Sequence, residues 1–116
     1  KGVENYVTFR LATVFGPGSR MRTDLLVNNF VLRALKEKML ILYECEFMRN
    51  YVHLTDVCRA FRHVLDNWEL CKEETYNVGN EKFYSKGFEC KSDLQDGIKQ
   101  LIKAYAIIDS PWYANY

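Results

Sequence analysis

The chain has 116 residues, enough for one compact domain and short for two. Apolar residues make up 48% of it and charged residues 27%, a balance that excludes disorder of the whole chain. The formal net charge of +1 excludes strong attraction to nucleic acid or to an anionic membrane, and no apolar run approaches the roughly 18 residues that span a bilayer. We therefore expect neither nucleic-acid nor membrane partners.

The first predicted element is a strand over residues 6–15, which are rich in β-branched and aromatic side chains. Val7, Phe9 and Leu11 fall on one face, and we expect the second half of the strand to be covered on both sides. The sequence Gly-Pro-Gly at residues 16–18 ends the strand, because proline cannot donate to a sheet and glycine permits a sharp change of direction.

A helix is predicted over residues 23–38, where apolar side chains recur at helical spacing and basic residues gather toward the C-terminal end. Thr23 or Asp24 is the expected cap of this helix. Two short strands are predicted next, at residues 39–43 and 49–54, with a polar interruption between them.

The second helix is predicted over residues 57–70 and is capped by Thr55 and Asp56. We interpret Asp56 as structural, because a carboxylate near the first turn accepts backbone N–H bonds and complements the helix dipole. Strands that alternate with about three helices favour an α/β fold. Two further elements complete the order: a short strand at residues 76–79 and a last helix that begins at Ser92 or Asp93.

The first residues of the sequence carry no apolar stretch of a secretion signal. We therefore expect a cytoplasmic protein whose cysteines are reduced rather than paired in disulfides. No metal site is expected, because the cysteine spacing fits no zinc knuckle and His53 and His63 form no pair at ligand spacing. His53 has no placed acid or nucleophile beside it, which favours packing or solvent exposure over a general-base role. The cysteines are Cys45, Cys58, Cys71 and Cys90.

Four stretches of the sequence together resemble one family. They are RLATVFGP at residues 10–17, RNYVHLTDVCRAF at 49–61, YNVG at 76–79 and GFECKSDLQDGIKQLIKAY at 87–105. The series resembles the C-terminal part of NAD-dependent epimerase/dehydratase proteins, the extended short-chain dehydrogenases that act on nucleotide sugars. The family pattern runs R-x-x-N-V-Y-G-P, then R-D-Y-V-H-V-x-D-V, then Y-N-V-G, then G-F and a helix that opens L-x-x-G-I. Four matches in this order make the resemblance specific.

The resemblance implies a partial Rossmann-type α/β domain over residues 1–116 that corresponds to the substrate-binding portion. The family's glycine-rich turn, which brings the NAD pyrophosphate to a helix N-terminus, and its catalytic Tyr-x-x-x-Lys pair are both missing from this sequence. The resemblance implies that both lie before Lys1, so no catalytic residue is predicted. The short connection after residue 79 implies an internal deletion around residues 80–90.

The resemblance also implies binding roles for individual residues. The substrate diphosphate is expected to bind Arg49, because a planar guanidinium forms two parallel hydrogen bonds with it. The region after the Gly-Pro-Gly turn is expected to line the nucleotide-sugar site, or to leave its two amides on an exposed side of the helix. The residues concerned there are Arg22, Asn28 and Asn29, and the nicotinamide end of NAD is expected beside Ala12, Thr13 and Val14.

Three functions stay open on the sequence. The first is a fragment of an NAD-dependent sugar-nucleotide epimerase (an isomerase) or dehydratase (a lyase) that supplies part of the substrate lobe and is inactive alone. The second is a non-catalytic relic or regulatory subunit that packs on a full-length relative, or on a second copy, through a sheet face left without cover. The third is a small nucleic-acid binder that uses Arg20, Arg22 and Arg49, which the near-zero net charge disfavours.

Overall fold

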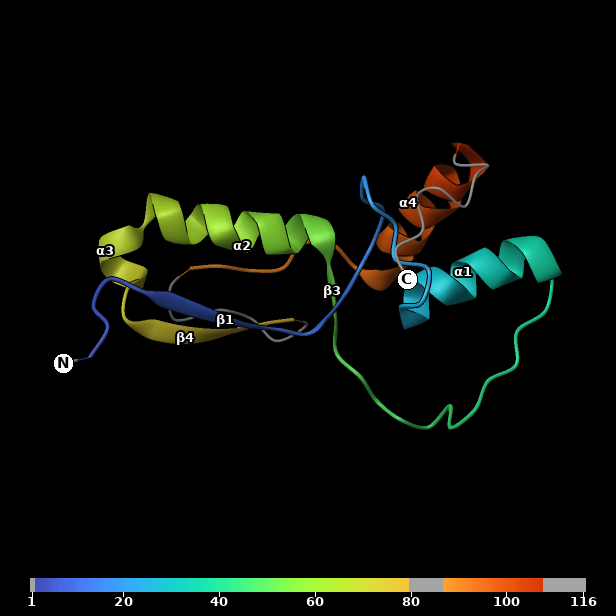
Figure 1. The fold of residues 1–116 in the computed structure, drawn as a ribbon, viewed down its shortest axis with the longest axis horizontal. Helices are drawn as coiled ribbons and strands as arrows, with labels where there is room; N and C mark the ends of the chain where they lie inside the picture. The colour runs from blue at the N-terminus through green and yellow to red at the C-terminus, as the bar shows by residue number, and fades with distance from the viewer. Residues whose placement is uncertain (1, 80–86, 108–116) are drawn as a thin grey trace. The chain divides into compact units, whose positions relative to one another are not determined.

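The computed structural model describes residues 2–79 and 87–107. The chain divides into two compact units: unit 1 comprises Lys1–Val14 and Asn50–Ser92, and unit 2 comprises Phe15–Arg49 and Asp93–Tyr116. In chain order the elements in Figure 1 are β1 (Val7–Leu11), β2 (Thr13–Phe15), α1 (Leu26–Glu37), β3 (Tyr51–His53), α2 (Leu54–Asp66), α3 (Trp68–Cys71), β4 (Glu74–Val78) and α4 (Leu94–Ile107).

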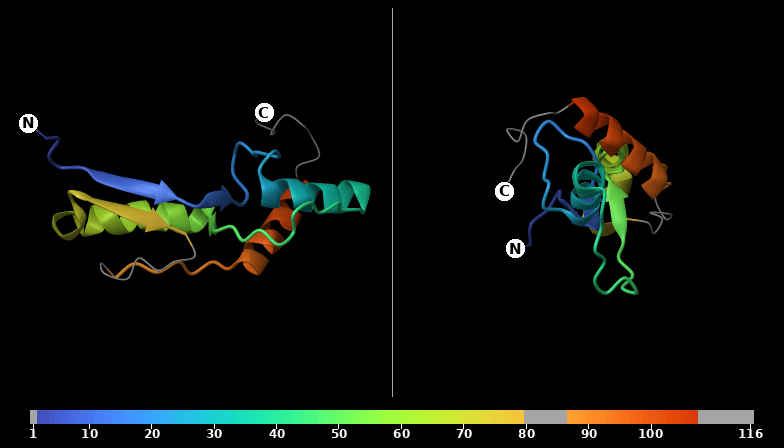
Figure 2. Two further views of the ribbon diagram at one scale, coloured as in Figure 1. Left: turned by 90° about the horizontal axis from the view of Figure 1, so that it is seen from below. Right: turned by 90° about the vertical axis from the view of Figure 1, so that its right-hand side faces the viewer.

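Unit 1 is built on a two-stranded parallel sheet of β1 and β4, in register from Val7↔Glu74 to Leu11↔Val78. The helix α2 runs along one face of this sheet (Figures 1 and 2). On that face the Phe9 ring meets the Phe61 ring of α2 edge-on, with 4.8 Å between the ring centroids. The buried core beneath α2 consists of Val52, Val57, Ala60, Val64, Cys71, Tyr76, Val78 and Phe88.

The opposite face of this sheet is polar, because successive side chains of a strand point to opposite faces. Its members are exposed: Thr8, Arg10, Thr75 and Asn77. The expectation that the first strand is covered on both sides in its second half is wrong at Leu11, whereas Ala12, Thr13 and Val14 are half-buried. Leu11 is exposed, and Phe15 is the one buried side chain of β2.

The predicted strand over residues 6–15 is in fact two strands, because its hydrogen-bonding partner changes along the way. The Ala12 N–H donates to the Val78 carbonyl at 2.8 Å, whereas the Thr13 N–H donates to the Asn50 carbonyl at 3.2 Å. β2 consequently pairs with β3, while β1 pairs with β4.

The helix α2 starts earlier than the sequence pattern predicts, at Leu54. Its N-cap is His53, whose Nδ1 accepts a hydrogen bond from the Thr55 N–H at 3.2 Å, so the predicted cap by Thr55 and Asp56 is wrong. His53 is buried, as expected for a packing role. The helix ends at Asp66, and α3 follows after Asn67 as a separate short helix.

In unit 2, α1 packs against α4, and the Tyr105 hydroxyl donates to the Asn28 carbonyl at 3.0 Å. The predicted cap of α1 is wrong: the N-cap is Leu25, which supplies no side-chain hydrogen bond. The predicted start of α4 is confirmed, because the Asp93 carboxylate accepts the Asp96 N–H at 2.7 Å. None of the described helices is long and apolar enough to cross a membrane.

The predictions for the short strands had mixed outcomes. The strand predicted at residues 76–79 is confirmed as β4, although it begins two residues earlier, at Glu74. Of the strand predicted at residues 49–54, only β3 forms. The strand predicted at residues 39–43 is wrong: this segment is exposed throughout and pairs with no strand among the described residues.

Candidate functional site

The strongest candidate site of unit 1 lies where β1 and β4 end. The two strands are parallel, so their carboxyl ends meet at one edge of the sheet, which is the edge where ligands of α/β folds bind. A hollow of ≈ 280 Å³ opens there. Its lining consists of Arg10, Leu11, Ala12, Asn50, Asn77, Val78 and Gly79.

Gly79 keeps this hollow open. A Cβ added to Gly79 would lie 3.0 Å from the Ala12 Cβ and 3.9 Å from the Asn50 Cβ. The first distance is shorter than ordinary van der Waals contact, so a side chain at Gly79 would push the strand ends apart. The close approach of the residues just after β1 and β4 therefore favours glycine at this position.

Of the three residues predicted to bind the cofactor, Ala12 lines the hollow and Thr13 and Val14 do not. The Ala12 and Thr13 N–H groups already donate to sheet carbonyls, at 2.8 and 3.2 Å. These two N–H groups therefore cannot serve as free donors for a dinucleotide.

The predicted substrate residues of unit 2 lie in and just before α1. Asn28 is only 2% exposed: its Oδ1 accepts the Gly16 N–H at 3.2 Å and its Nδ2 donates to the Arg22 carbonyl at 3.0 Å. The Asn29 Nδ2 donates to the Thr23 carbonyl at 2.9 Å. Both amides thus hold the loop that leads into α1. The prediction that they face a ligand or decorate an exposed side of the helix does not fit these bonds.

The two predicted arginines of unit 2 differ in their partners. The exposed Arg22 binds the Asp24 carboxylate through Nε, at 3.1 Å, and through Nη2, and this pairing lowers the pKa of Asp24. Arg49 is exposed, and within the described part of the chain its guanidinium forms no hydrogen bond or ion pair. Arg49 therefore keeps its donors for a ligand, whereas Arg22 does not.

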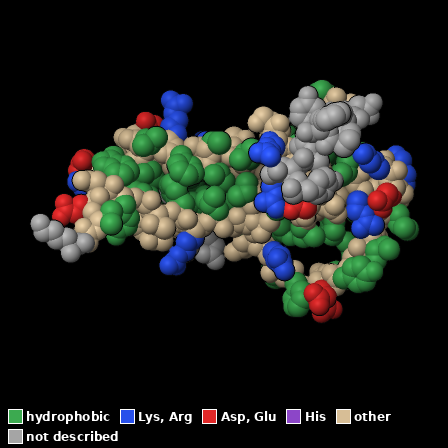
Figure 3. Space-filling model, in the orientation of Figure 1, with side chains coloured by type: hydrophobic (Ala, Val, Ile, Leu, Met, Phe, Trp, Pro, Cys, Tyr) green, Lys and Arg blue, Asp and Glu red, His purple; other side chains and the backbone are tan. Residues whose placement is uncertain are grey.

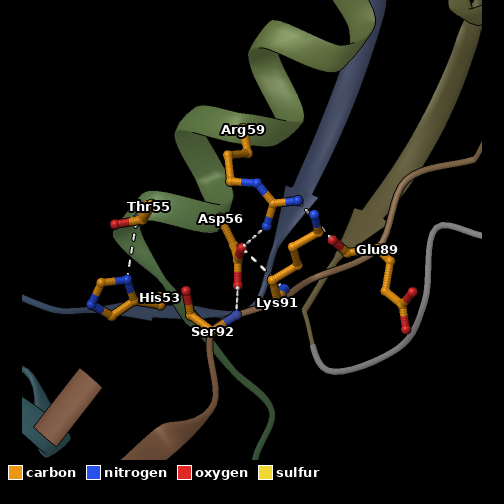
Figure 4. A network of polar contacts seen from close by, with 7 residues as sticks. All are labelled: His53, Thr55, Asp56, Arg59, Glu89, Lys91 and Ser92. Carbon is orange, nitrogen blue, oxygen red and sulfur yellow. Dashed lines mark hydrogen bonds and ion pairs between the residues drawn. The ribbon is translucent and has the colours of Figure 1, made fainter. Parts of the chain in front are cut away.

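A second hollow in unit 1, of ≈ 380 Å³, lies beside a network of polar contacts around Asp56. Figure 4 shows the Asp56 carboxylate bound by the Arg59 guanidinium at 2.5 Å and by the backbone N–H groups of Lys91 and Ser92, at 3.2 and 2.9 Å. The structural role predicted for Asp56 fits these contacts, but the backbone N–H groups that it accepts belong to the segment before α4, while its own helix supplies the Arg59 side chain. The hollow is lined by Arg59, Arg62, His63, Asp66, Gly87, Phe88, Glu89 and Lys91.

Side chains that could hold a metal do not gather in the described residues. The four cysteines are free: Cys45 and Cys58 are exposed, Cys71 is buried and Cys90 is half-buried. Burial raises the pKa of the Cys90 thiol, and the nearby Asp56 carboxylate raises it further.

Sequence reasoning missed most of the first hollow, including Arg10, Asn50 and Asn77. The signal present in the sequence was the alternation of polar and apolar residues along each strand. This alternation indicates which side chains share a face, but it does not indicate that Arg10 and Asn77 are partners across β1 and β4.

Two comparisons with known proteins agree with this architecture. The profile of the NAD dependent epimerase/dehydratase family matches residues 2–79. The fold is similar to the crystal structure of UDP-glucose 4-epimerase with UDP-glucose from the hyperthermophilic eubacterium Thermotoga maritima. The TM-score is 0.71 at 19% sequence identity, over 90% of this chain and 47% of that one.

The match confirms the predicted fold class, a partial Rossmann-type α/β domain with short parallel strands. This chain spans about half the length of the matched epimerase. The family profile covers more than half of the chain and includes the RLATVFGP, RNYVHLTDV and YNVG stretches. The protein belongs to the NAD dependent epimerase/dehydratase family.

Proposed function

We propose that this chain is the C-terminal, substrate-binding portion of a nucleotide-sugar epimerase or dehydratase, and that it is inactive alone. The observation that carries the proposal is the family match over residues 2–79. The matched range contains the arginine that is predicted to bind the diphosphate, and this arginine is exposed and forms no hydrogen bond or ion pair with the described residues. That residue is Arg49. A second support is that the similar fold from Thermotoga maritima was solved with UDP-glucose.

Two features of unit 2 suit a diphosphate. The Arg49 guanidinium is available for two parallel hydrogen bonds to phosphate oxygens. The N-terminus of α1 has no side-chain cap and no acidic residue in its first turn, so its N–H groups and the positive end of its dipole favour an anion. The Arg49 guanidinium and the N-terminus of α1 both belong to unit 2, and each attracts phosphate.

NAD, when bound in a complete enzyme, would accept a hydride from the sugar carbon that carries a hydroxyl, as that hydroxyl loses its proton, and would later return the hydride. Of the residues predicted to lie beside it here, Ala12 and Thr13 have their N–H groups bonded to carbonyls of the sheet. The glycine-rich turn and the Tyr-x-x-x-Lys pair are also missing from the sequence. We therefore assign no step of hydride chemistry to this chain and propose that it acts in the cytoplasm as part of a larger assembly.

Calorimetric titration of the full chain with UDP-glucose, UDP and NAD tests this proposal. We expect binding of UDP-glucose and UDP but not of NAD, and no turnover of UDP-glucose when NAD is added. Arg49→Gln should weaken UDP binding about tenfold, the loss of one charge-assisted hydrogen bond. Arg62→Gln, which removes another exposed arginine, should leave UDP binding unchanged. Tight NAD binding, or equal UDP affinity of the Arg49 variant and the parent chain, would overturn the proposal.

One observation favours the alternative of a non-catalytic subunit that packs on a full-length relative. Figure 3 shows hydrophobic side chains gathered over α2 and β1. Within the described residues, β1 pairs with β4 along one edge and with no strand along the other. An open edge beside apolar side chains is a typical docking site for another strand. This patch, called the edge patch below, consists of Leu11, Phe61 and Leu65.

A further inference from the structure

We propose that the hollow at the carboxyl ends of β1 and β4 binds a small oxyanion of the phosphate type. The ligand would bind through the side chains of Arg10, Asn50 and Asn77, which line the hollow. The site lies wholly within unit 1, and its residues are distinct from Arg49 and α1 of unit 2. The proposal therefore does not depend on the nucleotide-sugar function.

The sheet register brings the first two ligand groups together. Arg10 and Asn77 are partners across the parallel pair of β1 and β4. The preceding partners, Phe9 and Tyr76, pack toward the core under α2. Because side chains alternate along a strand, Arg10 and Asn77 both point to the opposite, exposed face. A cation and a carboxamide thus lie side by side at the end of the sheet.

The charge of the lining favours an anion. Arg10 is the one charged residue among the seven that line the hollow, and there is no carboxylate among them. Within residues 2–79 and 87–107, the side chains of Arg10, Asn50 and Asn77 form no hydrogen bond or ion pair with one another or with other described residues. Their donors are therefore available to a ligand, and a guanidinium and two amides together suit an oxyanion with several acceptor oxygens.

Asn50 supplies the third group from a fixed backbone. Its carbonyl accepts the Thr13 N–H at 3.2 Å, so the main chain is held by β2 while the side chain lines the hollow. An aspartate stands at this place in the family pattern. An aspartate here would neutralise Arg10 and repel an anion, whereas Asn50 keeps the hollow positive. The Asn50→Asp variant therefore changes the charge of the hollow while the side chain keeps nearly the same shape.

The size of the hollow limits the ligand. Its volume of ≈ 280 Å³ lies just below the range for small-molecule pockets, which starts at roughly 300 Å³. Gly79 prevents the strand ends from filling this space with a side chain. The hollow therefore suits a phosphate or pyrophosphate group rather than a whole dinucleotide.

Nuclear magnetic resonance titration of the 15N-labelled full chain tests the site. Sodium phosphate and sodium pyrophosphate are added in separate arms, with sodium chloride at matched ionic strength as the control. We expect saturable shifts of the amide signals of Arg10, Asn77 and Gly79 in the phosphate arms only. Shifts that grow linearly with chloride and phosphate alike would indicate ionic strength alone and would overturn the proposal.

Five variants make the test specific. Arg10→Gln and Asn50→Asp should each weaken phosphate binding about tenfold or more, and Arg10→Lys should keep part of it. Arg62→Gln, which alters the other hollow, should bind as the parent chain does. A melting curve of each variant shows that it is folded. Unchanged binding by folded Arg10→Gln would overturn the proposal. Arg49→Gln should leave the Arg10 and Asn77 shifts unchanged, so failure here and failure of the nucleotide-sugar proposal are distinguishable.

Discussion

Asp56 shows how a single residue organises unit 1. Its side chain is fully buried, and a buried carboxylate is costly unless donors surround it. Asp56 meets this requirement with donors from distant parts of the chain, because Lys91 and Ser92 follow it by 35 and 36 residues. The guanidinium of Arg59, one helical turn further along α2, completes the set. Asp56 thus fastens the segment before α4 to α2.

We expect Asp56→Asn to lower the free energy of unfolding by about 2–4 kcal/mol, because the amide cannot accept the same bonds and the Arg59 charge loses its partner. The matched control is Asp66→Asn, which breaks the exposed pair with Arg62 at 3.7 Å and should cost less than about 0.5 kcal/mol. Urea denaturation followed by circular dichroism measures both. Equal losses in the two variants would contradict the role given to Asp56.

Cys90 carries a pH-dependent prediction at the same scale. Burial, followed by the Asp56 charge, raises the pKa of its thiol above the ordinary 9.0. Because the thiolate is the reactive form, alkylation of Cys90 by iodoacetamide at pH 8 should be slower than that of the exposed Cys45 and Cys58. Because this pKa is higher in the folded chain than in the unfolded chain, the unfolded chain loses the thiol proton at a lower pH. The stabilisation by the protonated Cys90 is therefore complete below about pH 9 and is lost as the pH rises through the folded-state value.

Mass spectrometry of peptides alkylated between pH 7 and pH 9 measures these rates. The buried Cys71 serves as the slow reference. In Asp56→Asn the nearby negative charge is gone, so Cys90 should react faster than in the parent chain. Labelling of Cys90 as fast as Cys58 in the folded parent chain would show that burial does not hold its proton.

At the scale of elements, α1 ends at a residue with unfavourable backbone geometry. The C-cap of α1 is Lys38, whose φ of 57° lies in the left-handed region that glycine adopts without strain. Lys38→Gly should therefore stabilise the protein by about 0.5 kcal/mol, the relief of strain less the entropy of a more flexible unfolded chain. Lys36→Gly, inside the last turn, should destabilise it by about 1 kcal/mol. Thermal melts that move in the same direction for both variants would contradict this assignment.

The elements that could be predicted from sequence are those whose signals are local. The apolar periodicity of α2 and the Asp93 cap of α4 depend on neighbours within one or two turns, and both predictions were accurate to a few residues. The strand expected at residues 39–43 failed because an apolar run becomes a strand only when another strand pairs with it. Pairing is a tertiary property, and the residue order alone does not contain it.

The candidate site was harder to predict for a related reason. Asn28 has the right chemistry for a ligand, yet its amide is used by Gly16 and Arg22, which only the folded loop reveals. Arg10 and Asn77 lie 67 positions apart in sequence, and the register of two strands decides that they meet. The type of each residue could be read from the sequence, whereas the hydrogen-bonding partners of each polar side chain could not.

At the scale of the whole molecule, the sheet of unit 1 is small for its type. Parallel strands usually lie inside larger sheets with both faces covered. At the two ends of β1 the Tyr6 carbonyl accepts the Glu73 N–H at 2.6 Å and the Ala12 N–H donates to the Val78 carbonyl, so these even-numbered residues turn their backbone toward β4. The backbone groups of Val7 and Leu11 therefore point to the open edge. The polar face can meet water, whereas within the described residues this edge has no strand beside it.

This geometry predicts association through the edge patch. Leu65 is 71% exposed and Phe61 51% exposed, and covering such side chains contributes about 25 cal/mol per Å². We expect the full chain to sediment as more than a monomer at high concentration, or to bind a full-length relative when the two are mixed. Leu65→Lys should weaken either association at least tenfold, because it places a charge in the contact, while circular dichroism shows an unchanged fold. Ile107→Lys, at an even more exposed apolar position on α4, should associate as the parent chain does. A parent chain that stays monomeric and does not bind the full-length relative would contradict this prediction. It would show that the open edge of β1 is stable in water, which we would then attribute to the polar face of the sheet.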